Sequence, residues 1–261
     1  MFSHRYFFMI TLLGFSLVVA NEQQSHVSHS SLIHRIKNSL ANQFGTEQLA
    51  PEKEKLIRSI MQEMGIIKNI EIRKMNRHGM TTFGLYNAFA YLDSYLFFSE
   101  HFFTKLNTEE QRFLIGHELM HIEQRYVYKQ STVIWGNYFA NVALCWYAYQ
   151  LLNKKRLSSK MQRPLIIGLH VALNIINKLN ELRRARYFEQ DADKESAIRL
   201  KCAQGGISFL KKMKQLTDDF PLQGNYDYST WWKRLWANHP NNEKREKYLQ
   251  EISKNQTTLK Q

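Results

Sequence analysis

Two histidines and a glutamate in the segment Gly116–His121 (GHELMH) stand at a spacing that suits metal chemistry. Histidines four residues apart lie on one face of an α-helix, about one turn from each other. Their imidazoles can then bind a single zinc ion, with the glutamate beside it to handle protons. We therefore expect one zinc ion per chain, with His117 and His121 as ligands and Glu118 as the general base.

The segment that carries this motif has the features of a largely buried helix. Asn107-Thr108-Glu109-Glu110 resembles a capping box, which places acidic side chains at the positive end of a helix. Apolar side chains then form a broad face: Phe113, Leu114, Leu119, Met120 and Ile122. The alternative to a zinc site is a helix with two ordinary histidines. The presence of a candidate third ligand elsewhere in the chain argues against this alternative.

A catalytic zinc site needs a third protein ligand and keeps its fourth position for water. The glycine and histidine that extend the motif in the metzincin proteases are missing, because Gln124 and Val127 stand at those positions. The ligand must therefore come from another segment. The competing side chains are Glu189, Asp191, Glu195 and His170. His170 lies in an apolar stripe of helical spacing, which favours a packed histidine, and the choice among the carboxylates stays open.

The residues before the motif are typical of strands, and those after it are helical. Alternation is clearest at Ile70 and Ile72. Asn76–Gly79 resembles a turn, and the aromatic-rich stretches Thr82–Leu85 and Tyr95–Ser99 are β-prone. The pattern predicts a small, mostly antiparallel sheet directly before the HExxH helix. Since helical spacing dominates the rest, the expected fold class is α+β and mainly helical.

The composition of the 261-residue chain suits one catalytic domain with a helical appendage. Apolar residues make up 44%, and 36 lysines and arginines against 23 acids give a net charge of +13. The basic residues are spread along the chain without a nucleic-acid-binding motif, so we expect no nucleic-acid partner. Such a surface better suits an anionic membrane face or acidic partners. The two cysteines are too few for a disulfide framework.

The chain divides into an export signal, a leader, one domain and a tail. Residues 1–20 have a short basic start, an apolar run and small residues before position 21, as signal peptides do. An uncleaved anchor helix is the other interpretation. A polar leader and first helix are expected at 21–49, the zinc domain at 50–253 and a polar tail at 254–261. The signal predicts export to the periplasm or the exterior.

Two apolar helical stretches follow the HExxH segment. Residues 131–153 carry no charge, but their asparagines, tyrosines and tryptophans favour an interface. After a basic loop, the second stretch at 164–177 is shorter than a membrane span. We expect an apolar helical hairpin at 131–177 that packs on the domain or makes peripheral contact with a membrane.

Four elements in order resemble the HtpX-like and CAAX-prenyl-protease-like zinc metallopeptidases of peptidase family M48. They are Asn87-Ala88-Phe89-Ala90, then HELMH, then Glu189 with Asp193, and then His239-Pro240 with Arg245. The resemblance covers about residues 50–250 and implies a zincin-like fold. Spanning helices like those of the integral members are not evident before residue 50, which favours the secreted or periplasmic branch.

The resemblance also implies roles for the matching residues. His117 and His121 match the first two zinc ligands, and Glu118 matches the general base. Glu189 matches the third ligand, which comes from a separate helix. Asp193, one turn later, matches an aspartate that supports the site and could hold a ligand imidazole in the right tautomer.

The remaining matches concern substrate and the catalytic centre. Asn87 and Ala88 match the edge strand that takes up substrate. His239 and Arg245 match a motif whose residues lie near the catalytic centre. At position 239 the imidazole would stabilise the oxyanion or cap the metal.

The predicted activity is zinc-dependent endopeptidase hydrolysis of unfolded or mislocalised envelope proteins, as a form of protein quality control. The partner is then a polypeptide. The alternative is a catalytically weak, chaperone-like or membrane-surface zinc-binding protein of the same fold. Glu118 favours the enzyme, since a site without catalysis has no need of a base.

Overall fold

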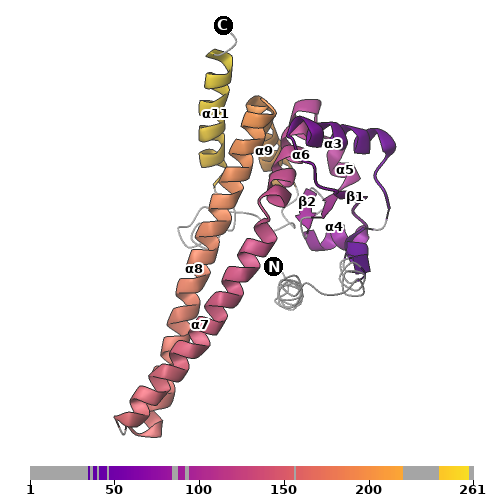
Figure 1. Cartoon of the computed structure of the whole chain (residues 1–261). Helices are drawn as coiled ribbons and strands as arrows, with labels where there is room; N and C mark the ends of the chain where they lie inside the picture. The colour runs from indigo at the N-terminus through magenta and orange to yellow at the C-terminus, as the bar shows by residue number, and fades with distance from the viewer. Residues whose placement is uncertain are drawn as a thin grey trace.

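The computed structural model describes residues 35, 38, 39, 41–45, 47–83, 88–91, 94–155, 157–219 and 241–258. Figure 1 shows a body with a small sheet and several helices, from which a long arm of two helices projects. The expected signal peptide at 1–20 lies outside the described residues, as do most of the leader and the segment 220–240. The predictions for these parts stay predictions.

Helix α3 (Pro51–Glu63) begins the zinc domain expected at 50–253. Proline suits its first turn because the missing N–H has no partner there in any helix. The helix ends before Gly65, whose φ of +72° is the left-handed conformation that glycine adopts at low cost. Its buried face contributes Ile57, Ile60 and Met61 to the core.

The sheet has three strands among the described residues: β1 (Glu71–Lys74), β2 (Ala88–Tyr91) and β3 (Tyr95–Phe98). Their order is β1-β3-β2, with β1 parallel and β2 antiparallel to β3. The expectation of a mostly antiparallel sheet was therefore wrong, and the sheet is mixed. Strand β1 can run parallel to β3 because the chain that leaves β1 crosses over through a helix before it reaches β2 and β3.

That crossover is α4 (Arg77–Phe83), where a turn and the start of a strand were expected. Asn76 explains the difference, since its side-chain Oδ1 accepts a hydrogen bond from the Gly79 N–H at 2.8 Å. The Asn76 carbonyl also accepts from the Met80 N–H at 2.9 Å. This local capping starts a helix and outweighs the β propensity of the threonines and phenylalanine that follow.

Helix α6 (Thr108–Glu123) lies at the centre of the body and carries the HExxH motif. It packs against α3, β2 and two later helices, α8 (Ser159–Arg199) and α9 (Ala203–Asp219). The approach of α8 is close at Gly116, where an added Cβ would lie 3.0 Å from the Ser196 Cβ and 2.6 Å from a methyl carbon of Leu200, the residue that caps α8. Glycine at this position therefore lets α6 and α8 bring their functional side chains together.

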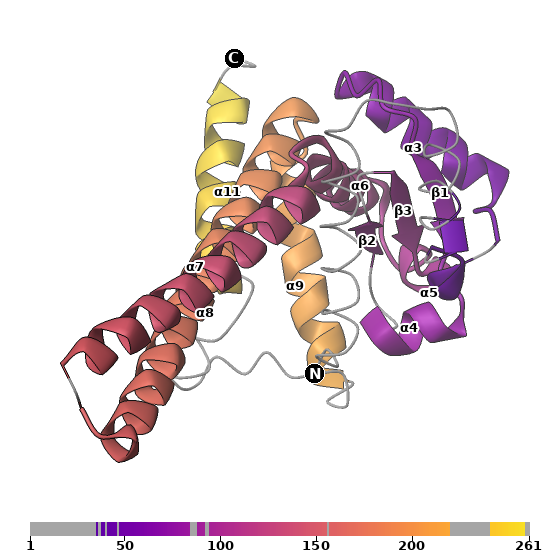
Figure 2. The same cartoon turned by 60° about the horizontal axis from the view of Figure 1, so that its bottom comes forward.

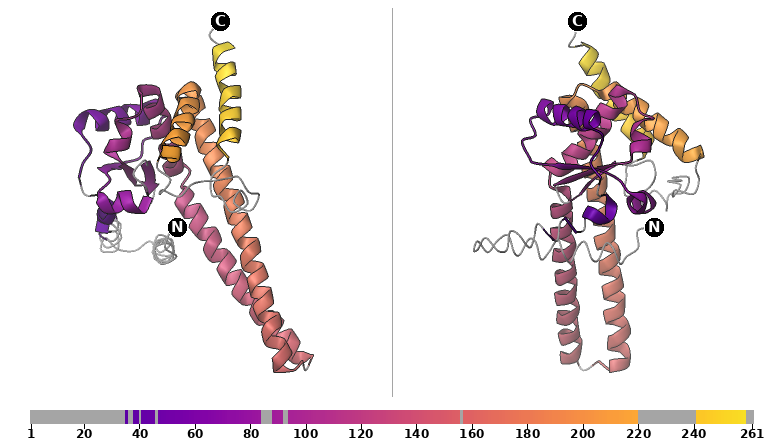
Figure 3. Two further views of the ribbon diagram at one scale, coloured as in Figure 1. Left: turned by 180° about the vertical axis from the view of Figure 1, so that it is seen from behind. Right: turned by 90° about the vertical axis from the view of Figure 1, so that its right-hand side faces the viewer.

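The arm is formed by α7 (Tyr126–Lys154) and the first half of α8, which lie side by side (Figures 1 and 3). The hairpin expected at 131–177 falls on these two helices. Helix α8 continues without a break from the arm into the body. Among the described residues, no helix combines the length and apolarity needed to cross a membrane.

Helices α9 and α11 (Asn242–Thr258) pack together and against α8. Cys145 and Cys202 are both free, so no bridge links them; Cys145 is half-buried and Cys202 is buried. His170 is exposed, 4.0 Å from the Cys145 sulfur, and is not the packed core histidine that its stripe suggested.

Candidate metal centre

The helix that carries the motif begins as the sequence predicts. Asn107 Oδ1 accepts from the Glu110 N–H, and Glu110 Oε2 accepts from the Asn107 N–H, each at 2.9 Å. This confirms the capping box, which satisfies two otherwise unpaired backbone donors. The helix is buried on nearly all sides, so His117, His121 and Glu118 occupy a rigid segment.

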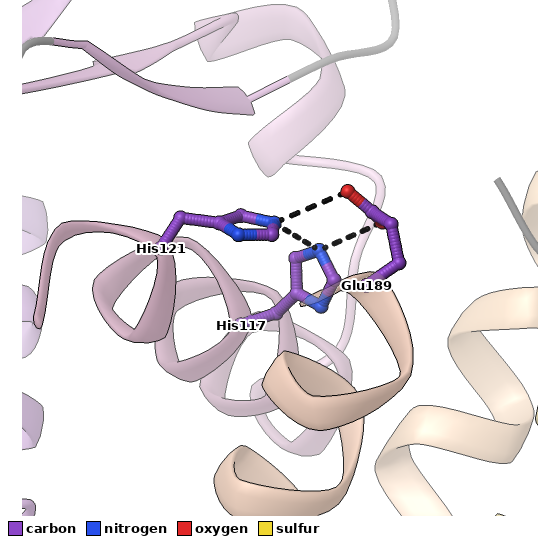
Figure 4. A group of neighbouring side chains, drawn as sticks. All are labelled: His117, His121 and Glu189. Atoms are coloured by element: carbon purple, nitrogen blue, oxygen red, sulfur yellow. Dashed lines mark hydrogen bonds and ion pairs between the residues drawn. The ribbon is translucent and has the colours of Figure 1, made fainter. Parts of the chain in front are cut away.

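Helix α8 brings Glu189 to the two histidines, as Figure 4 shows. The two Nε2 atoms of His117 and His121 lie 3.2 Å apart. The Glu189 carboxylate lies 3.5 Å from His117 Nε2 and 3.3 Å from His121 Nε2. One ligand atom from each residue thus lies within 4.8 Å of the others.

This triangle has the size of a zinc site. Ligand atoms about 2.0–2.1 Å from one centre at tetrahedral angles lie about 3.3–3.4 Å from each other. The two Nε2 atoms lie 3.2 Å apart, and His117 Nε2 and His121 Nε2 lie 3.5 and 3.3 Å from the two different oxygens of Glu189, so each of these contacts is close to that value. Two imidazoles and one carboxylate are also a donor set that zinc prefers, with a fourth position left for water.

The other candidate ligands from the sequence point elsewhere. Asp191 accepts a hydrogen bond of 2.6 Å from Gln124 Nε2. Glu195 accepts from Arg199 Nε at 3.1 Å on the same helix. With His170 on the arm, Glu189 is the candidate that the fold brings to both histidines.

The carboxylates around His117 favour a positive charge at the site. Burial lowers the pKa of His117, but hydrogen bonds and charge from Asp193 and Glu189 outweigh it and raise the pKa to about 10. In this buried pocket the imidazole therefore favours a bound cation, whether a proton or a metal ion. The residues present fit zinc on both geometry and charge.

Glu118 lies beside the triangle and is held by the sheet. Its Oε2 accepts a hydrogen bond of 2.9 Å from the backbone N–H of Ala90 in β2. The side chain is buried, with the residue 7% exposed. Burial raises the pKa of Glu118, against the opposite effect of the two imidazoles. A carboxylate with a raised pKa is better suited to accept a proton at neutral pH.

Asp193 lies on the far side of His117, one turn after Glu189. Its Oδ1 lies 2.9 Å from His117 Nδ1, an arrangement that leaves Nε2 free to bind metal. Arg245 of α11 donates two hydrogen bonds of 2.6 Å to the same carboxylate, one to each oxygen. Burial raises the pKa of Asp193, but the Arg245 charge and the His117 bond hold it well below its usual range.

The structure thus places Arg245 on Asp193, where it acts through the carboxylate and His117. It adds a residue that the sequence did not suggest, Tyr248, whose hydroxyl donates to Asp193 Oδ2. Tyr248 follows Arg245 by three residues, so both side chains lie on one face of α11. That spacing, next to a candidate site arginine, is the signal that could have indicated it.

The expected substrate residues lie partly within the described chain. Ala88 begins β2, the edge strand beside α6 (Figure 2). Asn87 and His239 lie outside the described residues, so their roles stay predictions.

The model of peptidase family M48 matches residues 51–253, most of the chain. The chain belongs to this family. A comparison with curated proteins gave no match. Membership in family M48 indicates a metal-dependent protease, and His117, His121 and Glu189 form a group that could bind the metal.

Proposed function

We propose that this M48 family member is a zinc-dependent endopeptidase that cleaves extended, unfolded polypeptides. The observation that carries the proposal is the triangle of His117, His121 and Glu189, with Glu118 buried beside it on the sheet side. A site of this kind keeps one coordination position for water and holds a carboxylate ready to activate it. The zincin-like fold is part of the same proposal.

Each residue of the site would have a separate role in peptide hydrolysis. Zinc held by His117, His121 and Glu189 would polarise the scissile carbonyl and lower the pKa of a water molecule. Glu118 would take the water proton and return it to the leaving amine. Asp193 would keep His117 in the tautomer that binds metal through Nε2. For His239 we retain the role of oxyanion stabiliser or metal cap.

Strand β2 is the proposed site of substrate capture. The Ala90 N–H points away from β3, toward Glu118. Because N–H groups two residues apart in a strand point to the same edge, the Ala88 N–H also faces away from β3. An extended peptide can add to such an edge through main-chain hydrogen bonds, which give affinity with little sequence preference. Asn87, next along the chain, would bind the same peptide.

We further propose that the protein is exported and acts in the periplasm or outside the cell. The support is the sequence of residues 1–20, with its basic start, apolar run and small residues at the cleavage position. Unfolded or mislocalised envelope proteins are then the expected substrates, and proteolytic quality control is the expected role. N-terminal sequencing of the mature protein should find a start near Asn21.

The experiment is cleavage of casein by the purified protein, with metal content measured on the same samples. The parent should contain one zinc, lose activity with a chelator and regain it with added zinc. Glu118→Gln should keep zinc but lose about 10²–10⁴-fold in activity, the usual contribution of a general base. A zinc-loaded, folded parent that does not cleave would instead support the chaperone-like alternative.

Substrate capture has its own test in Ala88→Pro, which removes one donor at the strand edge. Casein cleavage should fall sharply while zinc content and thermal stability stay near those of the parent. Ala88→Gly is the matched control, because it keeps the N–H. Unchanged cleavage by a folded, zinc-loaded proline variant would show that the edge does not bind substrate.

A further inference from the structure

The arm has an unusual distribution of side chains for a pair of helices in water. Among its buried residues are the polar Asn141 and Gln162, which are 4% and 8% exposed. Large apolar side chains face outward instead, with Trp146 and Ile167 each 63% exposed. Water favours the reverse arrangement, because apolar burial is the main driving force of packing. Many large apolar side chains exposed on one element indicate a binding face.

Both helices contribute to this apolar surface. Phe139, Trp146 and Tyr147 stand out from α7, and Leu165, Ile167 and Val171 from α8, each at least half exposed. The less exposed positions of this part of α7, at 141, 145, 148 and 152, repeat at three- and four-residue intervals, which is the spacing of a helix face packed on another helix. The pairing therefore uses one face of each helix and leaves the apolar flanks uncovered.

The charge of the arm identifies the kind of partner. Residues 124–180 contain eight lysines and arginines and no aspartate or glutamate. Four of these bases gather at the tip, where Lys154 and Lys155 end α7 and Lys160 and Arg163 lie in the first turns of α8. All four are exposed. A partner must therefore combine an apolar interior with negative charge at its surface.

We propose that the α7–α8 arm docks on the surface of a lipid bilayer that carries anionic headgroups. The tip bases contact the headgroups, and the aromatic and aliphatic flanks enter the boundary between headgroups and acyl chains. Tyrosine and tryptophan suit that boundary because each has an apolar body and a polar end. This surface is separate from the metal centre, and the inference does not depend on the proposed peptidase activity.

Charge disfavours a second copy of the chain as the occupant. Pairing two arms through their apolar flanks would bring two acid-free basic segments together, and like charges repel strongly where water is excluded. A nucleic acid would satisfy the bases but would leave the aliphatic flanks exposed. The bilayer satisfies both features.

The test is flotation of the full-length protein with vesicles of phosphatidylcholine alone or mixed equally with phosphatidylglycerol. Binding should require phosphatidylglycerol and weaken with salt. Lys154→Glu with Lys155→Glu should weaken binding at least about tenfold, since each base near an anionic surface contributes measurably. Lys211→Glu with Lys214→Glu, at exposed positions on α9, is the matched charge control and should bind like the parent.

A second variant tests the apolar flank without changing charge. Trp146→Ser with Tyr147→Ser should weaken vesicle binding at least about tenfold, because less apolar area leaves water. Ile167→Ser with Val171→Ser gives the same test on α8, with circular dichroism confirming the fold of each.

Three outcomes would overturn the proposal. Equal binding of parent and both serine variants would make the arm a general polyanion site, which heparin binding would reveal. Equal binding to neutral and anionic vesicles would remove the role of charge. Absence of vesicle binding, with self-association in sedimentation velocity that the serine variants abolish, would make a second copy the partner.

Discussion

The two halves of helix α8 use opposite rules of burial. In the body, Asp193 and Ser196 are fully buried and Glu189 is 8% exposed, although all three are polar. In the arm, Leu165 and Ile167 are 51% and 63% exposed, although both are apolar. One continuous helix therefore places polar groups in the interior at one end and apolar groups on the surface at the other.

The difference follows from the partners that the protein offers to each half. Burying a charge is unfavourable unless it is paired and hydrogen-bonded, and the inner half meets that requirement through His117 and Arg245. The outer half has no internal partner for its apolar flanks among the described residues. Substitutions in the two halves should therefore differ greatly in their effect on the isolated protein.

The largest effect on stability is expected from Arg245→Met. Removing one partner of a buried ion pair leaves the Asp193 charge unpaired, which typically lowers the free energy of unfolding by about 3–5 kcal/mol. Urea unfolding would measure it. Arg58→Met is the control, because Arg58 forms an exposed pair with Glu54 whose loss should change little. Equal destabilisation by the two variants would contradict the importance of the buried pair.

Glu110→Gln is expected to lower the free energy of unfolding by about 1–3 kcal/mol at neutral pH. Burial raises the pKa of Glu110, but bonds from Lys212, Ser208 and the Asn107 backbone outweigh burial and lower the pKa overall. A lowered pKa means that the carboxylate stabilises the fold above its unfolded pKa, an effect lost as pH falls through the folded value.

The difference between the parent and Glu110→Gln should therefore narrow as the pH falls below about 4. Thermal unfolding across a pH series would measure this. The control is Glu109→Gln, at an exposed neighbouring position, which should change the thermal stability little at any pH. A gap that stays constant with pH would show that ionisation of Glu110 does not contribute.

A smaller effect is expected from Tyr248→Phe, which removes one hydrogen bond to Asp193 and keeps the ring. Supporting groups around metal ligands typically change metal affinity by about 10–100-fold, and the lower end applies because Arg245 remains. Competition with a chromophoric chelator would measure the affinity. Tyr187→Phe, at an exposed site on α8, should bind zinc like the parent. Equal affinities in both variants would remove Tyr248 from the support of the site.

The smallest effect is expected in the arm. Ile167→Ser with Val171→Ser should change the free energy of unfolding by no more than about 0.5 kcal/mol, the usual range for surface positions. Cleavage of a soluble peptide should also be unchanged. A loss of several kcal/mol would show that this flank packs against the protein itself, and the comparison between the two halves of α8 would fail.

Local sequence determined the elements whose signals are contained within a few residues. The capping box at Asn107 and the four-residue spacing of His117 and His121 needed only helical geometry. The helical stretch expected at 164–177, which is part of α8, followed from its spacing in the same way. These features were predictable because each depends on contacts between residues one turn apart.

Tertiary structure decided the features that depend on contacts between distant segments. Glu189, Asp191 and Glu195 lie on one helix and are chemically alike, and only the packing of α8 against α6 at Gly116 brings the first to the histidines. The partner of Arg245 and the role of Tyr248 depend in the same way on where α11 docks. The mixed sheet depends on the parallel pairing of β1 with β3, which is again a contact between separate segments. Local patterns do not specify such choices, because the energy that decides them comes from burial and charge pairing between separate segments.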